Sequence, residues 1–188
     1  MERSAPQTAS SIGKLLTLLI LLIAVLAAAL AWWHNMNKGR AALAFWSGSV
    51  AHRIRTADSV ELWVLATGDD LVARREDFGG RQFWMAQVID ISQAPGLVHA
   101  RQALISDASF DWEATAGATG ATGATGAGQA DWQYAIRFTS DGQSTLVLLD
   151  LERAWAAQGD HPGRVARLLI ADGLQEFLAE QVTLDGAC

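Results

Sequence analysis

Residues 133–152 read QYAIRFTSDGQSTLVLLDLE, and this stretch decides the fold. Two runs of strand-forming residues flank Asp141-Gly142, a pair that favours the two-residue type I′ turn of a β-hairpin. This turn fixes which residues face each other: Ser140 and Gln143, Phe138 and Thr145, Ile136 and Val147, Tyr134 and Leu149. The second run is apolar on both faces at 146–149, which predicts a central strand covered on each side.

Sequence patterns around the hairpin predict further strands and helices. The following runs have the composition of strands: 59–66 (SVELWVLA), 81–91 (RQFWMAQVIDI) and 163–171 (GRVARLLIA). The stretch between the first two is polar and ends in glycines, so we expect a loop there. SQAP at 92–95 resembles a helix start with a capping serine, and DGLQEFLAEQV at 172–182 is expected to form a closing helix. The predicted fold class is therefore α+β, a small, mostly antiparallel sheet packed with two or three helices.

An uncharged apolar run at 15–33 (LLTLLILLIAVLAAALAWW) precedes this domain. It is about as long as the ~20 residues that a helix needs to cross a bilayer. Lys14 before it and Trp32-Trp33 at its end suit the lipid–water interface. We expect an N-terminal tail at 1–14 and a transmembrane helix at 15–33, which makes the chain a single-pass membrane protein with a signal-anchor.

A cleaved signal peptide is the alternative interpretation of this run. Ala29-Leu30-Ala31 and Ala42-Leu43-Ala44 both have the small-x-small form of a cleavage site, but the apolar region of a signal peptide is usually shorter, about 7–15 residues. We favour the retained anchor. Basic residues lie on both sides of the span, so the positive-inside rule is nearly tied. Because short tails ahead of a first span commonly stay in the cytoplasm, we expect the protein in the cell membrane with its C-terminal domain exported.

Residues 34–57 follow the span and are expected to form a juxtamembrane amphipathic helix. Its apolar residues recur at spacings of three and four: Ala42, Leu43, Phe45, Trp46, Val50 and Ile54. This helix could lie on the membrane surface, or it could be the first helix of the domain and pack on the sheet. We favour the packed helix, although Gly48 weakens either version. The α+β domain is expected at 58–188.

Charge divides the chain at about the start of this domain. Through Thr56 there are six Lys or Arg residues and one acid, a net charge of +5, whereas from Ala57 on there are eight Arg and nineteen Asp or Glu residues, a net charge of −11. A domain this acidic is repelled by phosphate backbones, so nucleic acid is not an expected partner. The basic part lies on both sides of the span, where anionic lipid headgroups attract Lys and Arg.

The repeat GATGATGATGAG at 117–128 lies in a segment, 114–130, without charge or large side chains. A phosphate-binding loop would follow a strand and precede a helix, and collagen needs many more triplets. A linker between two domains is also excluded, because the chain after the repeat is too short to bury a core alone. We interpret 114–130 as a flexible insertion in one domain, whose length costs little stability.

No motif predicts a cofactor, a metal site or a nucleophile. The histidines lack metal-ligand spacing, no serine lies in a G-x-S-x-G motif, and Cys188 is the only cysteine, which excludes an internal disulfide. The candidate catalytic residues are Asp107, Asp111, Asp150 and Glu152, together with Arg101. Asp150 and Glu152 would project from one face of a strand and the other two would end the neighbouring helix. Paired carboxylates serve acid–base catalysis or cation binding, although such residues more often cap helix ends.

Arg101 is the unusual charge of the globular part. It falls in the middle of an apolar helix face formed by Leu97, Val98, Leu104, Ile105 and Ala108. Burying it requires a carboxylate or several carbonyls as partners. We expect the stem to pack and the head to reach an acid such as Asp107 or Asp150.

Several segments together resemble an uncharacterised family of bacterial single-pass membrane-anchored proteins. They are DISQAPGLVHARQALISDASFDW, DWQYAIRFTSDGQSTLVLLDLE and IADGLQEFLAEQ, behind an N-terminal span and over residues 15–182. The resemblance implies that the length between the two Asp-Trp elements varies, in agreement with an insertion. It supplies no activity and no catalytic residue.

Two hypotheses of function follow from the sequence. The favoured one is a membrane-tethered acidic domain that mediates protein–protein interaction or assembly, with the lipid bilayer and another protein as partners. The alternative is a membrane-tethered hydrolase or cation-binding domain that uses Asp107, Asp111, Asp150 and Glu152. We favour the binding domain over the enzyme.

Overall fold

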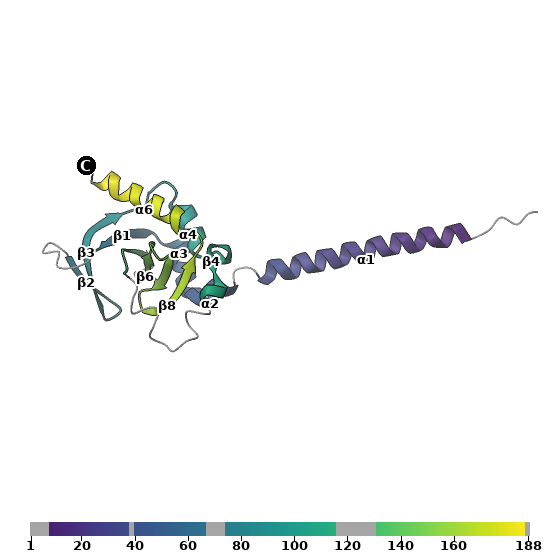
Figure 1. Cartoon of the computed structure of the whole chain (residues 1–188), viewed down its shortest axis with the longest axis horizontal. Helices are drawn as coiled ribbons and strands as arrows, with labels where there is room; N and C mark the ends of the chain where they lie inside the picture. The colour runs from purple at the N-terminus through teal and green to yellow at the C-terminus, as the bar shows by residue number, and fades with distance from the viewer. Residues whose placement is uncertain (1–7, 38–39, 67–73, 116–130, 187–188) are drawn as a thin grey trace, which may run out of the picture. The chain divides into compact units, whose positions relative to one another are not determined.

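The computed structural model describes residues 8–37, 40–66, 74–115 and 131–186. The chain divides into two compact units, Met1–Lys38 and Gly39–Cys188 (Figure 1). The first seven residues of the expected tail, residues 116–130 of the expected insertion and Cys188 lie outside the described residues.

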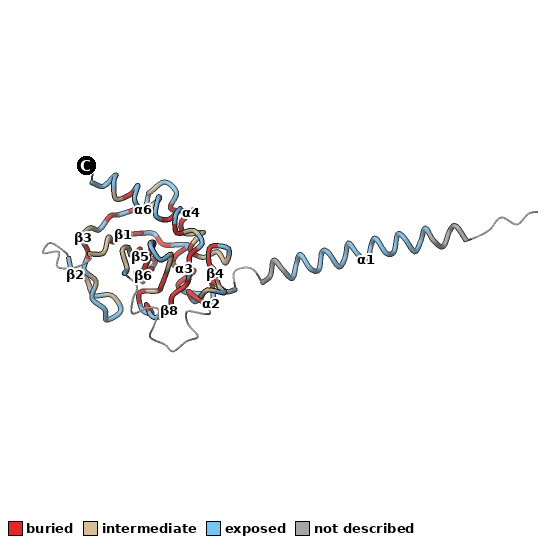
Figure 2. Tube along the Cα trace, in the orientation of Figure 1, coloured by how far each residue is buried: buried red, intermediate tan, exposed pale blue. Residues whose placement is uncertain are grey.

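The helix α1 (Thr8–Asn37) carries the apolar run. Its stretch Gly13–Trp33, 21 residues, is long and apolar enough to cross a membrane, and its side chains are exposed throughout (Figure 2). At 1.5 Å per residue this stretch is ~32 Å long, which matches a hydrocarbon core of ~30 Å. A signal sequence near the N-terminus has the same properties. The helix therefore agrees with membrane insertion by its length and composition.

The second unit is built on an eight-stranded sheet with the order β2-β3-β1-β5-β6-β7-β8-β4, in which every pairing is antiparallel. The predicted α+β class with a mostly antiparallel sheet is confirmed. The strands are β1 (Ser59–Leu65), β2 (Arg74–Phe78), β3 (Arg81–Asp90), β4 (Phe110–Asp111), β5 (Tyr134–Ser140), β6 (Gln143–Asp150), β7 (Trp155–Gln158) and β8 (His161–Leu168).

The predicted hairpin is β5–β6, and its register is confirmed at every expected pair. Asp141 and Gly142 have φ angles of 52° and 72°, the left-handed values that a type I′ turn needs at both central residues. β6 lies between β5 and β7 and is buried on both faces. Val147 and Leu149 belong to one apolar core, whereas Leu146 and Leu148 belong to a second core across the sheet.

Helices cover one face of the sheet (Figure 1). They are α2 (Arg40–Trp46), α3 (Gly48–Thr56), α4 (Leu97–Leu104) and α6 (Ala171–Asp185). Trp46, Ile54, Leu104 and Leu178 are fully buried beneath them and form the larger core with alternate residues of the strands. Each of these four helices therefore contributes side chains to the larger core.

The predicted juxtamembrane helix is packed on the sheet, but it consists of two helices. The break lies at Ser47, whose φ of 69° interrupts the helix and whose Oγ accepts a hydrogen bond from Val50 N at 3.5 Å, as an N-cap of α3. Ala42 is buried, so a signal peptidase that cut after Ala44 would remove part of the folded domain. Of the two candidate cleavage sites, only Ala29-Leu30-Ala31 leaves the domain intact.

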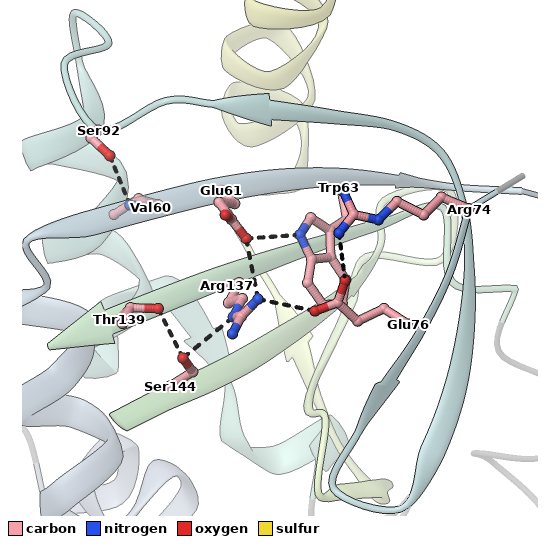
Figure 3. A network of polar contacts seen from close by, with 9 residues as sticks. All are labelled: Val60, Glu61, Trp63, Arg74, Glu76, Ser92, Arg137, Thr139 and Ser144. Carbon is pink, nitrogen blue, oxygen red and sulfur yellow. Dashed lines mark hydrogen bonds and ion pairs between the residues drawn. The ribbon is translucent and has the colours of Figure 1, made fainter. Parts of the chain in front are cut away.

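The sheet curls strongly on its other face, and Figure 3 shows the bend of β3. In a flat sheet β2 and β5 would be three strand spacings apart, about 14 Å. Instead, Glu76 Oε1 of β2 lies 3.2 Å from Arg137 Nη1 of β5. A Cβ added to Gly79 in the β2–β3 turn would lie 2.5 Å from Oδ1 of Asp160 in the β7–β8 turn. The β2–β3 hairpin thus folds over the second core, which centres on Trp63, as in a partly closed barrel.

Two expectations about local structure were wrong. The polar loop expected between the first two strands contains β2, whose sequence RREDF is charged because it forms an edge of the sheet. Ser92 does not cap the following helix, which begins at Leu97 after a left-handed Gly96. Its Oγ accepts from Val60 N at 2.9 Å and donates to Asp90 Oδ1 at 2.5 Å, so it ties the end of β3 to β1.

Candidate functional site

The structure places the predicted carboxylates in different elements. Asp150 ends β6, and Glu152 lies exposed in the turn that follows, so the two do not project from one strand. Asp107 begins the 3₁₀ helix η1 (Asp107–Ser109) and Asp111 lies in β4, whereas α4 already ends at Leu104. Both expectations about their placement were wrong. β6 ends at Asp150, before Glu152, and the sequence after α4 folds into η1 and a short edge strand that hold Asp107 and Asp111.

Asp111 and Asp150 share one row of the sheet but lie far apart in it. Asp111 faces Arg167, Arg167 faces Trp155, and Trp155 faces Asp150. Three strand spacings separate the two acids by about 14 Å. In the part of the chain that the structure describes, no three His, Cys, Asp or Glu side chains gather in a group that could hold a metal ion.

Asp150 is fully buried and has a clear structural role. Its Oδ1 accepts from Arg153 N at 3.0 Å, and its Oδ2 accepts from Asp131 N at 3.2 Å and forms a 3.0 Å ion pair with Arg153 Nη1. The carboxylate therefore holds the turn after β6 and the chain that leads into β5. A buried carboxylate is tolerated where several donors satisfy its oxygens in this way.

Asp107 and Asp111 also bond to backbone groups. Asp107 Oδ1 accepts from Ala42 N in the first turn of α2 at 2.7 Å. Asp111 Oδ1 accepts from Ala114 N at 3.0 Å. The bond to Asp111 is a local cap of the kind that such residues commonly form. The bond to Asp107 joins residues 65 positions apart and ties η1 to the start of α2.

Arg101 does not reach Asp107 or Asp150. Its Nη2 donates to Ala57 O at 2.8 Å and its Nη1 to Arg55 O at 3.4 Å, so the side chain caps the C-terminal end of α3. Carbonyl oxygens supply the partners that this arginine needs. The expected contact with the carboxylate of Asp107 or Asp150 was wrong. Nε of Arg101 is buried and has no hydrogen-bond partner among the described residues. Burial lowers the pKa of the guanidinium, and the charge of Asp58 opposes this only in part.

A groove of about 330 Å³ lies beside this guanidinium, between the end of α3 and α4. We call it the arginine groove. Two cationic side chains, Arg55 and Arg101, line it together with polar Ser92, Gln93 and Gln102 and apolar Ala94, Leu97, Val98 and Ile105. Arg55 is exposed, and Val98 is exposed over 68% of its surface. Two cations beside an apolar surface can hold a ligand that carries both an anionic and an apolar group.

A second arginine, Arg137, lies between two glutamates on the curled face of the sheet (Figure 3). Its Nη1 is 3.5 Å from Glu61 Oε2 and 3.2 Å from Glu76 Oε1, and its guanidinium lies over the Trp63 ring. Trp63 Nε1 donates to the same Glu61 at 3.3 Å. All the charges of this network are paired, so it braces β2 against β1 and β5 and leaves no cation for a ligand.

Sequence reasoning found one half of the arginine groove. Arg101 was identified by its place on an apolar helix face, but Arg55 was not, because α3 and α4 meet only in the tertiary structure.

No protein-family model, no curated protein and no solved structure matches the chain. The resemblance to bacterial membrane-anchored proteins therefore stays a prediction.

Proposed function

We propose that the second unit is a membrane-tethered recognition domain that binds an acidic segment of another protein in the arginine groove. One observation carries the proposal. Arg55 and Arg101 line a single groove with an apolar side, although the domain around them is acidic. The charge of Asp58 offsets the effect of burial on the pKa of Arg101 only in part.

The electrostatics of Arg101 favour an anionic ligand. Its carbonyl partners are neutral, and the effect of burial on its pKa exceeds that of Asp58. A guanidinium has five N–H donors, and two of the nitrogens, Nη1 and Nη2, keep one N–H each beyond the bonds to Arg55 O and Ala57 O. A carboxylate from a partner would accept charge-assisted hydrogen bonds and supply the missing countercharge.

The apolar side of the groove favours a peptide over a small ion. Leu97 forms part of its floor and Val98 remains largely exposed. A space of about 330 Å³ is at the lower end of the range for small-ligand pockets and has room for one or two side chains. An acidic residue followed by an apolar residue would satisfy both sides of the groove.

Membrane attachment would help a weak interaction of this kind. The apolar run of α1 confines the domain to a surface if it is retained, and confinement raises the effective concentration of a partner in the same membrane. A modest groove can then be sufficient for binding.

Site-specific photocrosslinking in cells tests the proposal. A benzophenone amino acid replaces Val98 in the groove or, as a matched control, Leu169, which is 64% exposed and does not line the groove. We expect a discrete crosslinked partner from position 98 only, and we expect Arg55→Glu to abolish it. Crosslinks of equal yield from both positions, or a crosslink that survives Arg55→Glu, would contradict the proposal.

A defined probe then tests the chemistry of the ligand. The crosslinked partner segment is synthesised with its acidic residues intact or replaced by amides and added to the full-length protein in detergent. The acidic form should bind and compete with the crosslink, whereas the amide form should not. Equal competition by both forms would exclude an anionic ligand.

The hydrolase or cation-binding alternative stays a prediction. Asp107, Asp111 and Asp150 accept hydrogen bonds from backbone groups, and Glu152 is exposed in a turn. No observation among the described residues favours that alternative.

A further inference from the structure

A hollow of about 190 Å³ lies where α2 meets the β7–β8 hairpin. Its lining combines aromatic and cationic side chains: Phe45, Trp46, Ser47, Gln158, His161 and Arg164. We call it the α2 pocket. It is separate from the arginine groove, with which it shares no residue.

Arg164 is fixed at the rim of this pocket. Its Nη2 donates to Ala44 O at 3.0 Å, and its guanidinium lies 5.4 Å from the centre of the Phe45 ring. Arg164 is exposed, and no acid pairs with it among the described residues. These contacts orient one cation toward solvent without neutralising it.

His161 adds a second nitrogen-bearing side chain to the pocket, and the neighbouring acid, Asp160, is not among the residues that line it. His161 is exposed, and its imidazole has no hydrogen bond to the residues that the structure describes. The carboxylate of Asp160 accepts from Gln158 Nε2 at 3.4 Å and packs against Gly79. The residues that face the pocket are therefore cationic or neutral.

The segment that forms one wall of the pocket is basic and follows the apolar run directly. Residues 38–56 contain Lys38, Arg40, Arg53 and Arg55 and no Asp or Glu. Only Lys38 and Gly39 separate the end of α1 from the start of α2. α2 therefore begins only seven residues after Trp33, the last residue of the stretch that is long and apolar enough to cross a membrane.

We propose that the α2 pocket binds the phosphate of an anionic phospholipid headgroup and so docks the domain on the membrane. Arg164 and His161 would donate to the phosphate oxygens, as arginine does in many phosphate sites. Leu43 on α2, which is 49% exposed, would enter the interfacial region beside them. Basic residues near an anionic leaflet are attracted to it, which matches the charge of residues 38–56.

Lipid-dependent quenching in nanodiscs tests this site with the full-length chain. Cys188→Ser removes the natural thiol, and Ser49→Cys places a fluorophore at an exposed position on α3 next to the pocket. Nitroxide-headgroup lipid serves as quencher in discs of phosphatidylcholine alone or in an equal mixture with phosphatidylglycerol. We expect strong quenching in the mixture and weak quenching in phosphatidylcholine.

Two substitutions and one matched control assign the effect to the pocket. Arg164→Gln should lower the ratio of docked to undocked domain about fivefold, the factor expected for one headgroup-facing arginine. His161→Ala should lower it without disturbing a described hydrogen bond. Arg75→Gln should leave this ratio unchanged, because Arg75 lies on β2 and does not line the pocket. It is a matched control because its guanidinium also lies over an aromatic ring, Trp84 at 5.6 Å. A fold control by circular dichroism accompanies each variant.

The outcomes separate lipid from other anions. Equal quenching in both kinds of disc would overturn the proposal, as would equal losses in Arg164→Gln and Arg75→Gln. Shifts of the His161 resonance with glycerophosphate, without lipid-dependent quenching, would show a site for free phosphate and would also overturn it. Failure here leaves the photocrosslink from position 98 unaffected, because the two sites share no residue.

Discussion

The carboxylate of Asp150 accepts hydrogen bonds from two backbone N–H groups and one side chain at the end of β6. It is fully buried and joins Asp131 N, Arg153 N and the Arg153 guanidinium. Glu152, two residues later, is exposed. The two acids, which the sequence presented as a pair, therefore differ in what their loss should cost.

We predict that Asp150→Asn lowers the free energy of unfolding by about 2–3 kcal/mol. The buried amide nitrogen cannot accept a hydrogen bond, and the ion pair with Arg153 is lost. Glu152→Gln should change it by less than about 0.5 kcal/mol. Urea unfolding of the full-length protein in detergent, followed by tryptophan fluorescence, measures both. Equal effects would indicate that Asp150 does not support the fold.

Asp90 makes a pH-dependent contribution to the free energy of unfolding. The Oγ–H and then the N–H of Ser92 donate to its Oδ1 and hold its pKa below the ordinary value. Because the folded-state pKa is lowered, the contribution is present above the unfolded pKa of about 3.9 and is lost as pH falls through the folded value. Ser92→Ala should therefore destabilise the protein more at neutral pH than below about pH 3.5.

Unfolding at several pH values measures this difference, with Ser49→Ala as the control on an exposed serine. The loss of the Val60 N bond to Ser92 Oγ adds a part that does not depend on pH. A difference between wild type and Ser92→Ala that stays constant from neutral to acid pH would contradict the role of Asp90.

At the scale of elements, the break between α2 and α3 combines strain with capping. Ser47 has a φ of 69°, a conformation that costs a non-glycine residue ~1–3 kcal/mol, but its Oγ also caps α3. Trp46 before the break and Ile54 after it are both fully buried.

We predict that Ser47→Gly stabilises the domain by about 1 kcal/mol, since glycine relieves the strain and is only slightly worse as an N-cap. Ser47→Ala should destabilise it by about 1 kcal/mol, because the cap is lost and the strain remains. Thermal unfolding of the two variants side by side tests the pair. Stabilisation by alanine would refute the capping role.

At the scale of the whole molecule, the insertion joins two anchored points of the sheet. Thr115 Oγ1 accepts from Arg167 N, and Asp131 N donates to Asp150 Oδ2. Arg167 and Asp150 both face Trp155, so the two anchors are about two strand spacings, ~10 Å, apart. A short connection is therefore sufficient to close the loop.

We predict that deleting residues 117–126 changes the free energy of unfolding by less than about 1 kcal/mol, because loop length enters only logarithmically. Unfolding of the deletion variant, together with the photocrosslink from position 98, tests whether the segment is inert. Loss of folding or of the crosslink would give the repeat a role.

The orientation of the chain in the membrane is a further prediction at this scale. Cys188 is the only cysteine of the sequence, so a membrane-impermeant maleimide reports on one position. We expect labelling in intact cells, which would place the domain outside the cytoplasm. Labelling only after lysis would place it on the cytoplasmic side; lysed and denatured samples and a known cytoplasmic thiol are the controls.

Local patterns determined much of this protein. The Asp141-Gly142 turn and the alternation around it specify the β5–β6 register, because a two-residue turn leaves one pairing. The apolar run specifies α1 by length and composition alone. Both features depend on contacts between residues that are close in sequence.

Only the tertiary structure decided the candidate site. The carbonyls that hold Arg101, the place of Arg55 beside it and the pairing of Glu76 with Arg137 all join residues more than forty positions apart. The charged residues of β2 form a strand because they pair with β3. Asp107 lies in η1, and two strands, β8 and β7, lie between Asp111 in β4 and Asp150 in β6. Such contacts depend on how the sheet curls and where the helices cross it, and a periodic pattern along the chain does not record either.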